Sequence, residues 1–139
     1  MFIKISYLTR IMKKYYLDVL TDKYSDFNGR ARRKEYWMWT LSVTIIFIFA
    51  MILDNLLGLN FELMGQDLGY GWIYLVAGIA HLIPGLAVVV RRLHDVGKSG
   101  WFYFIVLIPI IGVLWLLILL CTDGKKEDNK WGTNPKSIN

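Results

Sequence analysis

Three long apolar runs limit the fold of this 139-residue chain more than any other feature of its sequence. The runs cover about residues 37–57, 72–90 and 101–121 and are 21, 19 and 21 residues long. A helix of about 20 apolar residues crosses the hydrocarbon core of a bilayer, which is about 30 Å thick. The chain is 55% hydrophobic and 19% charged, whereas soluble domains average about 45–50% and about 25%. The sequence therefore predicts an all-α membrane protein with three transmembrane helices, in which residues 1–139 form one integral-membrane domain.

A weaker helical pattern precedes the first run. Within about residues 12–27, apolar and aromatic side chains recur at spacings of four, four and three residues, at Tyr16, Leu20, Tyr24 and Phe27. Such spacing places these side chains on one face of a helix, as in a short amphipathic helix that lies in the membrane interface. A polar lead-in with accidental periodicity explains the pattern equally well, and both interpretations stay open.

The positions of the basic residues predict an orientation in the membrane. Lysine and arginine number nine in residues 1–36, none in 58–71, three in 91–100 and four in 122–139. Because cytoplasmic loops are the basic ones, the N-terminus and the 91–100 loop are expected inside. Three crossings then put the C-terminal tail outside, which is our preferred topology.

The alternative topology is a third run that bends back as a re-entrant segment. Pro109 and Gly112 are the residues at which such a bend is expected, and Lys125 and Lys126 just beyond the run would then lie inside. A run of 21 residues is too short to cross the bilayer twice. The side of the C-terminal tail therefore stays open at this stage.

The basic residues next to the runs also indicate a partner. Arg91, Arg92 and Lys98 are expected at the level of the lipid headgroups, near free amide groups at the start of the third run. The earlier cluster adds three more candidate lipid-phosphate ligands, namely Arg30, Arg32 and Arg33. We expect membrane lipids with anionic headgroups as partners and no nucleic acid. Membrane topology and helix capping alone would explain the same cations.

The segment RRLHDVGKSGW at residues 91–101 brings His94, Asp95 and Ser99 close together in the sequence. A turn between two membrane helices explains most of it: Asp95 can pair with Arg91 or Arg92, Gly97 suits a left-handed helix end, and Ser99 can cap the next helix. Neither anchoring nor capping requires His94 beside Asp95.

Catalysis and metal binding have little support in the sequence. Cys121 is the single cysteine, and the two histidines are separated by 13 residues, about 20 Å along a helix. No established catalytic or metal-binding motif is present. We expect no enzymatic activity, no metal site and no cofactor.

His81 lies near the centre of the second run, three residues before Pro84. Ionisable groups at that depth face a partner, a cavity or a proton path, and the proline leaves the carbonyl of Ala80 without its helical donor. The simpler interpretation is a neutral imidazole bonded to a neighbouring helix. The alternative is a subunit of a small oligomeric transporter or channel that uses His81 and the kinks at Pro84 and Pro109. Asp54, near the outer end of the first run, is expected to reach water.

Four ordered segments resemble a known family. They are FNGRARRKEYW at 27–37, RRLHDVGKSGW at 91–101, IPIIG at 108–112 and NKWGTNP at 129–135. In this order and spacing the chain resembles family 805 of domains of unknown function, which are small bacterial inner-membrane proteins. The resemblance implies a multi-pass protein of the bacterial inner (plasma) membrane and carries over no activity and no site residues.

Relatives in that family tend to begin close to the position of Met12, so residues 1–11 are interpreted as an over-extended start. Taken together, the residues and the resemblance predict a structural, interaction or lipid-binding role without catalysis. The transporter interpretation requires a homo-oligomer, because three helices enclose little space.

Overall fold

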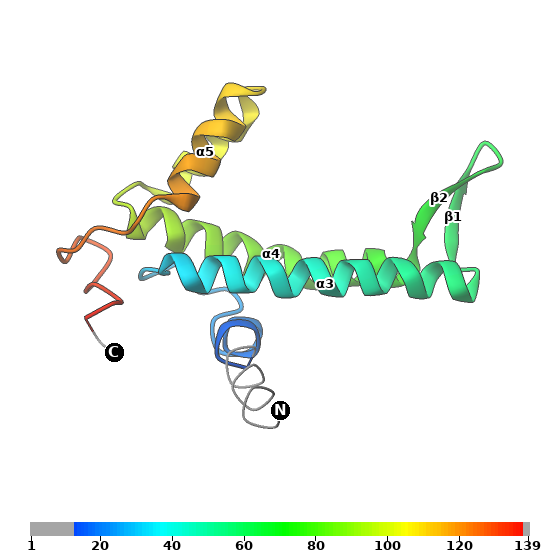
Figure 1. Ribbon diagram of the computed structural model, residues 1–139, viewed down its shortest axis with the longest axis horizontal. Coiled ribbons are helices and arrows are strands. Elements are labelled where there is room, and N and C mark those ends of the chain that lie inside the picture. The colour runs from blue at the N-terminus through cyan, green and yellow to red at the C-terminus, as the bar shows by residue number, and fades with distance from the viewer. Residues whose placement is uncertain (1–12, 138–139) are drawn as a thin grey trace, which may run out of the picture.

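The computed structural model of the chain describes residues 13–137. The elements, in order, are η1 (Lys13–Leu17), α2 (Asp18–Leu20), α3 (Arg33–Leu57), β1 (Asn60–Leu63), β2 (Gln66–Gly71), α4 (Trp72–Asp95), η2 (Gly100–Leu107) and α5 (Ile111–Cys121). In Figure 1, α3 and α4 lie side by side along the long axis of the molecule. The strands project from one end of this pair, which we call the hairpin end, and residues 122–137 lie at the other, which we call the tail end.

The first two apolar runs form the two longest helices. α3 has 25 residues and α4 has 24, and both are long and apolar enough to cross a membrane. Each extends beyond the predicted run at the tail end, to Arg33 and to Asp95. α4 closes as expected, because Gly97 adopts a left-handed φ of 80° and its N–H donates to the carbonyl of His94.

The third apolar run is not one helix, which corrects the prediction of three spanning helices. It is divided into the eight-residue 3₁₀-helix η2 and the 11-residue α5. Pro109 and Ile110 interrupt it, and Ile110 has a φ of 64°. A Cβ on Gly112 would lie 1.8 Å from the carbonyl oxygen of Ile105, so only glycine lets the two halves pack so closely. α5 is about 16 Å long, well short of a bilayer core.

Residues 60–71 correct the all-α prediction. β1 and β2 pair antiparallel, and Leu63 faces Gln66 across a two-residue turn. The turn residues Met64 and Gly65 both have positive φ, of 53° and 76°, as in the tight turns that suit hairpins. β1 has four residues and β2 has six, and neither shows a sustained alternation of apolar and polar side chains. For this reason they were not predicted from the sequence.

Asp54 joins α3 to α4 at the hairpin end. Its carboxylate is fully buried and accepts hydrogen bonds from the backbone N–H groups of Gly71, Ile73 and Tyr74, each at 2.9 Å. The carboxylate therefore caps the first turn of α4 from another helix, where α4 has no side-chain cap of its own. The expectation that Asp54 reaches water is wrong.

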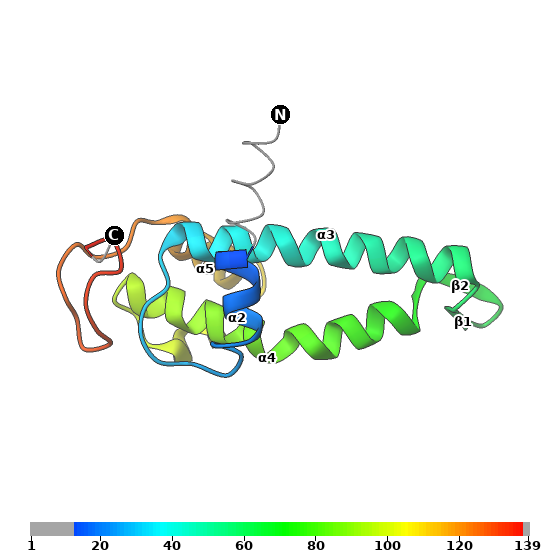
Figure 2. The same cartoon turned by 90° about the horizontal axis from the view of Figure 1, so that it is seen from below.

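The predicted amphipathic helix over 12–27 is shorter in the structure, and Met12 and the over-extended start predicted for 1–11 lie outside the described residues. η1 and α2 form helix from Lys13 to Leu20, and turns follow. Val19 is buried with Trp39 of α3 and Val88 of α4. Figure 2 shows this segment lying across both long helices. It therefore fastens α3 to α4 near the tail end of the pair.

Candidate functional site: a buried arginine cluster at the tail end

Five charged residues lie together where the tail end of the helix pair closes. Arg30 precedes α3, Glu35 lies in its first turn, and Arg91, Arg92 and Asp95 belong to the last turns of α4. All five are buried, with exposed fractions between 0% and 9%. We call them the arginine cluster. Charged side chains are rarely buried unless they are paired, so each of these needs identified partners.

Asp95 is the centre of the cluster. Its Oδ1 accepts a hydrogen bond from Nε of Arg30 at 3.0 Å, and its Oδ2 accepts one from Nη1 of Arg92 at 2.5 Å. The pairing with Arg92, three residues earlier on α4, was one of the two predicted from the sequence. The pairing with Arg30, 65 residues away, was not predictable from spacing.

The two arginines that bind Asp95 also hold the C-terminal tail. Arg30 donates from Nη1 to the carbonyl of Glu127 at 2.9 Å and from Nη2 to that of Lys125 at 2.5 Å. Arg92 donates to the carbonyls of Leu120 and Thr122, just where α5 ends. A Cβ on Gly124 would lie 2.0 Å from Oδ2 of Asp95, so the tail passes directly over that carboxylate. The tail and the 91–100 loop therefore share one end of the molecule.

Arg91 belongs to a second ion pair. Its Nη1 donates to Oε1 of Glu35 at 2.8 Å, and Nζ of Lys23 lies 3.6 Å from the same oxygen. The Nε and Nη2 groups of Arg91 are buried and have no hydrogen-bond partner among residues 13–137. In this respect Arg91 differs from both other arginines of the cluster.

His94 contacts the segment before α3 and the C-terminal tail, and these contacts were not predicted from the sequence. Its Nδ1 lies 3.1 Å from the carbonyl oxygen of Gly29, so this nitrogen carries the proton and donates. Its ring stacks on Trp131 with centroids 4.5 Å apart, and Asn129 donates to its backbone carbonyl. His94 thus fixes the tail through the NKWGTNP segment. Among the described contacts, its ring does not bond Asp95, whose oxygens bind arginine instead.

The predicted lipid-phosphate ligands divide into two groups. Arg30, Arg91 and Arg92 point inward, into the cluster. The other three lie nearer the surface: Arg32 donates to the Tyr15 hydroxyl at 2.8 Å, Arg33 is 53% exposed near Asp123, and Lys98 lies over the Phe102 ring. Ser99 stands at the N-cap position of η2 but makes no side-chain capping bond. A lipid role for these residues stays a prediction.

His81 is bonded at both ring nitrogens. Nδ1 lies 2.7 Å from the carbonyl of Ala77, which can only accept, so Nε2 accepts from the Tyr16 hydroxyl at 2.8 Å when the ring is neutral. The carbonyl of Ala80, freed by Pro84, accepts from the Tyr24 hydroxyl at 3.1 Å. The segment before α3 therefore satisfies the polar groups that α4 exposes near its centre.

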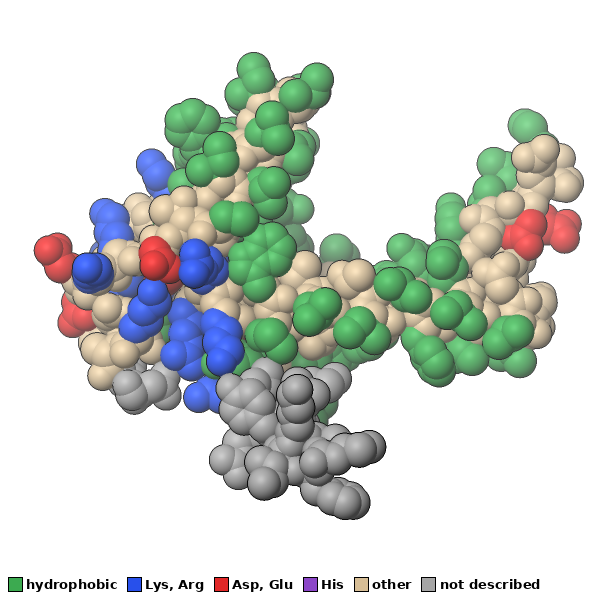
Figure 3. All heavy atoms as spheres, viewed as in Figure 1, with side chains coloured by type: hydrophobic (Ala, Val, Ile, Leu, Met, Phe, Trp, Pro, Cys, Tyr) green, Lys and Arg blue, Asp and Glu red, His purple; other side chains and the backbone are tan. Residues whose placement is uncertain are grey.

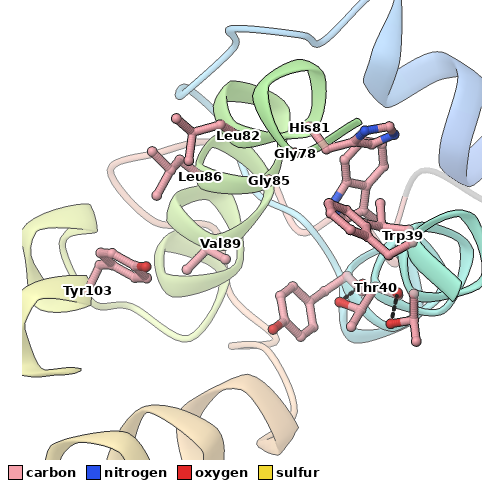
Figure 4. A pocket seen from close by; sticks show the side chains of 13 residues that line it. Trp39, Thr40, Gly78, His81, Leu82, Gly85, Leu86, Val89 and Tyr103 are labelled. Atoms are coloured by element: carbon pink, nitrogen blue, oxygen red, sulfur yellow. Dashed lines mark hydrogen bonds between the residues drawn. The ribbon is translucent and has the colours of Figure 1, made fainter. Parts of the chain in front are cut away.

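A groove of about 380 Å³ opens between α3 and α4 beside His81. Figure 4 shows His81 and Trp39 on one side of it and Tyr103, from η2, on the other. Among the described residues, no group of three histidine, cysteine or acidic side chains could hold a metal ion. The groove presents a bonded imidazole and hydroxyl groups rather than a free acid or base.

Comparison with known proteins was made over the whole chain. The model of a family described as "Protein of unknown function (DUF805)" matches residues 24–133. The inner membrane protein YhaH of Escherichia coli K12 is 43% identical over 123 residues, which is 88% of this chain and 96% of that protein. The inner membrane protein YhaI of the same strain is 39% identical over the same shares. No solved structure matches.

Proposed function

The chain belongs to the DUF805 family, and from this premise we propose that it is a two-span inner-membrane protein with a structural, lipid-binding role and no catalytic activity. α3 and α4 are the spans, and η2 with α5 forms a re-entrant hairpin in the cytoplasmic leaflet. The N-terminal segment, the 91–100 loop and the tail all lie in the cytoplasm.

One observation carries this proposal: exposed cations and exposed apolar helix surface meet at the tail end. Lys34 and Lys98 are exposed there, and so are Lys125 and Lys126. Trp101 and Leu107 of η2 are 79% and 75% exposed close by. In Figure 3 basic side chains gather around this end, at the base of the apolar α5, together with some acidic ones, whereas the charged side chains in view at the hairpin are acidic. Such a border between cations and apolar surface suits anionic headgroups above acyl chains.

The charge distribution supports the cytoplasmic assignment of the tail. The loop at the hairpin end, residues 58–71, has no lysine or arginine, whereas the tail has four. The hydrogen bonds from Arg30 and Arg92 to tail carbonyls support a tail on the same side as the 91–100 loop. The proposal therefore puts the tail inside, in place of the outer tail that three crossings would require.

Single-cysteine labelling tests the topology. In a Cys121→Ser background, Met64→Cys, whose native side chain is 97% exposed, reports the hairpin, and Ser137→Cys reports the tail. A membrane-impermeant maleimide added to intact spheroplasts should label the hairpin alone, and the tail only after permeabilisation. Labelling of the tail in intact spheroplasts would contradict the proposal.

Lipid enrichment tests the role. The protein purified from membranes in mild detergent should carry more phosphatidylglycerol than the bulk membrane, and Arg33→Met/Lys34→Met should lower that enrichment, because each cation near an anionic surface is worth about 1 kcal/mol. Lys136→Met is the control, since Lys136 forms the closer pair with Asp123, at 3.3 Å against 3.8 Å for Arg33, and Lys34 forms no ion pair among residues 13–137. Equal enrichment in all three proteins would overturn the lipid-binding role.

A further inference from the structure

The arginine cluster is not neutral. It contains the three guanidinium groups of Arg30, Arg91 and Arg92 but only the two carboxylates of Glu35 and Asp95. Lys23 adds a fourth positive charge at Glu35. Burying an uncompensated charge costs several kcal/mol, on the order of the stability of a whole domain. An excess of positive charge in a buried cluster therefore calls for an anion.

The hydrogen bonds show which donors of the cluster are free to bind an anion. A guanidinium group offers Nε–H and one Nη–H as a parallel pair of donors, which matches two oxygens of a phosphate or carboxylate. Arg30 uses its Nε and Nη2 on Asp95 and the carbonyl of Lys125, and Arg92 uses the same atoms on the carbonyls of Leu120 and Thr122. Among residues 13–137, Arg91 leaves this pair without acceptors, although its side chain is only 2% exposed.

A second cation lies beside the ion pair of Arg91 and Glu35 and is partly exposed. Lys23 follows the short helix α2, and its side chain is 42% exposed. Its ammonium group and Nη1 of Arg91 contact the same oxygen of Glu35. An oxyanion bound by Arg91 would therefore have a second, partly exposed cation close by, on the far side of the shared Glu35 oxygen.

We propose that Arg91, assisted by Lys23, binds one phosphate group through its free Nε and Nη2 donors. This inference rests on the proposed lipid-binding function and gives it a single stoichiometric site beneath the surface cations. The group comes either from the headgroup of an anionic phospholipid or from a free phosphate. It would supply the negative charge that the cluster lacks, so occupancy should stabilise the tail end of the fold.

Thermal unfolding of the full chain in a neutral, lipid-free detergent tests the site. The probes are phosphatidylglycerol, sodium phosphate, and sodium chloride at matched ionic strength. Phosphatidylglycerol or phosphate should raise Tm in a saturable way with one site per chain, and chloride should not. A response to phosphatidylglycerol alone identifies a lipid headgroup, and a response to phosphate identifies a free oxyanion. Equal responses to all three probes, or none, would overturn the proposal.

Variants distinguish binding at Arg91 from nonspecific attraction of anionic probes to the cations on the protein surface. Arg91→Lys keeps the charge but lacks the parallel donors, and should weaken probe binding about 10- to 100-fold, as expected for loss of hydrogen bonds to a charged group. Lys23→Met removes a half-exposed side chain, so it keeps the measurement possible if Arg91→Lys fails to fold, and should weaken binding by about tenfold.

Arg33→Met is the control, because Arg33 is an exposed cation outside the cluster. It should lower the enrichment of phosphatidylglycerol and leave the saturable site intact. If Arg33→Met and Lys23→Met weaken probe binding equally, the buried site is refuted and the proposed function stands. If neither changes the lipid content or the Tm response, both fail.

Discussion

Both ends of the α3–α4 pair bury carboxylates, but Asp54 at the hairpin end and Asp95 at the tail end are stabilised by different means. At the hairpin end, Asp54 accepts three backbone N–H groups at the start of α4, and no basic residue among 13–137 takes part. At the tail end, Asp95 is held by Arg30 and Arg92. The negative charge of Asp54 is stabilised by peptide dipoles, and that of Asp95 is stabilised by the positive charges of two arginines.

This difference follows from what each end has to join. Asp54 joins two helices separated by a 14-residue connection, and the amides at a helix start are sufficient for that task. The tail end assembles segments that lie up to 102 residues apart, as in the bond from Arg30 to the carbonyl of Gly132. Arginine has five donors in a rigid plane, so one side chain can bind a carboxylate and two carbonyls at once. The contacts at the hairpin end therefore join residues that are near each other in the sequence, whereas those at the tail end join residues that are far apart.

The largest effect is expected from Asp95→Asn. This change leaves Arg30 and Arg92 buried with no charged partner and should lower the free energy of unfolding by about 3–5 kcal/mol. Unfolding in detergent, followed by circular dichroism, measures it. Asp123→Asn is the control, because Asp123 is 61% exposed and should change stability by less than about 1 kcal/mol. Equal effects from the two variants would show that the cluster is not held by charge.

Asp54→Asn should have a smaller effect. The amide NH₂ would face backbone N–H groups in place of one carboxylate oxygen, leaving buried donors without acceptors at a cost of about 1–3 kcal/mol. Faster amide hydrogen exchange at Ile73 and Tyr74, with no change at Arg91 and Arg92, would locate the damage at the hairpin end. Damage that spread to the tail end would mean that the two ends do not act independently.

Tyr24→Phe tests the hydrogen bond from the Tyr24 hydroxyl to α4, which lies between the two ends of the helix pair. Its hydroxyl is the donor to the carbonyl of Ala80 that Pro84 leaves free, so its removal should cost about 1 kcal/mol and increase local opening of α4. Tyr70→Phe, at a half-exposed residue of β2, serves as the control in the same unfolding experiment. A cost no greater than that of the control would show that water satisfies this carbonyl.

The smallest effect concerns pH at the hairpin end. The backbone N–H of Gly69 and the side-chain amide of Asn60 hold the pKa of Asp67 below its ordinary value of 3.8. Because the folded pKa is lowered, Asp67 stabilises the hairpin above pH 3.8, and this contribution is lost as the pH falls through the folded pKa. The carboxyl chemical shift of Asp67 measures its titration. In Asp67→Asn the loss of hairpin stability at low pH that is due to this carboxylate should disappear. A normal titration at 3.8 would contradict this assignment.

The parts of the fold that depend on neighbours in sequence were predictable. The first two helices follow from the length and apolar character of their runs. The helix end at Gly97 follows from its tolerance of positive φ, and the pairing of Arg92 with Asp95 follows from helical spacing. The break in the third run was recognised at Pro109 and Gly112 as an alternative, but composition favours one long helix. Only the close approach of Gly112 to Ile105 decides for the bend.

By itself, the sequence determined that the first two apolar runs form helices long enough to span a membrane and that the loop between them, residues 58–71, has no lysine or arginine. The hydropathy of a run and the number of basic residues in a loop are both counted along a continuous segment of the sequence. They therefore do not depend on how the chain packs. The tertiary structure decided which arginine binds which acceptor. Apart from the local pair of Arg92 with Asp95, the partners in the arginine cluster lie 28 to 102 residues apart, for example Arg92 with Leu120 and Arg30 with Gly132. Which acceptors a guanidinium group meets depends on the packing of distant segments, and Arg91 is the one buried arginine among residues 13–137 whose Nε and Nη2 meet none.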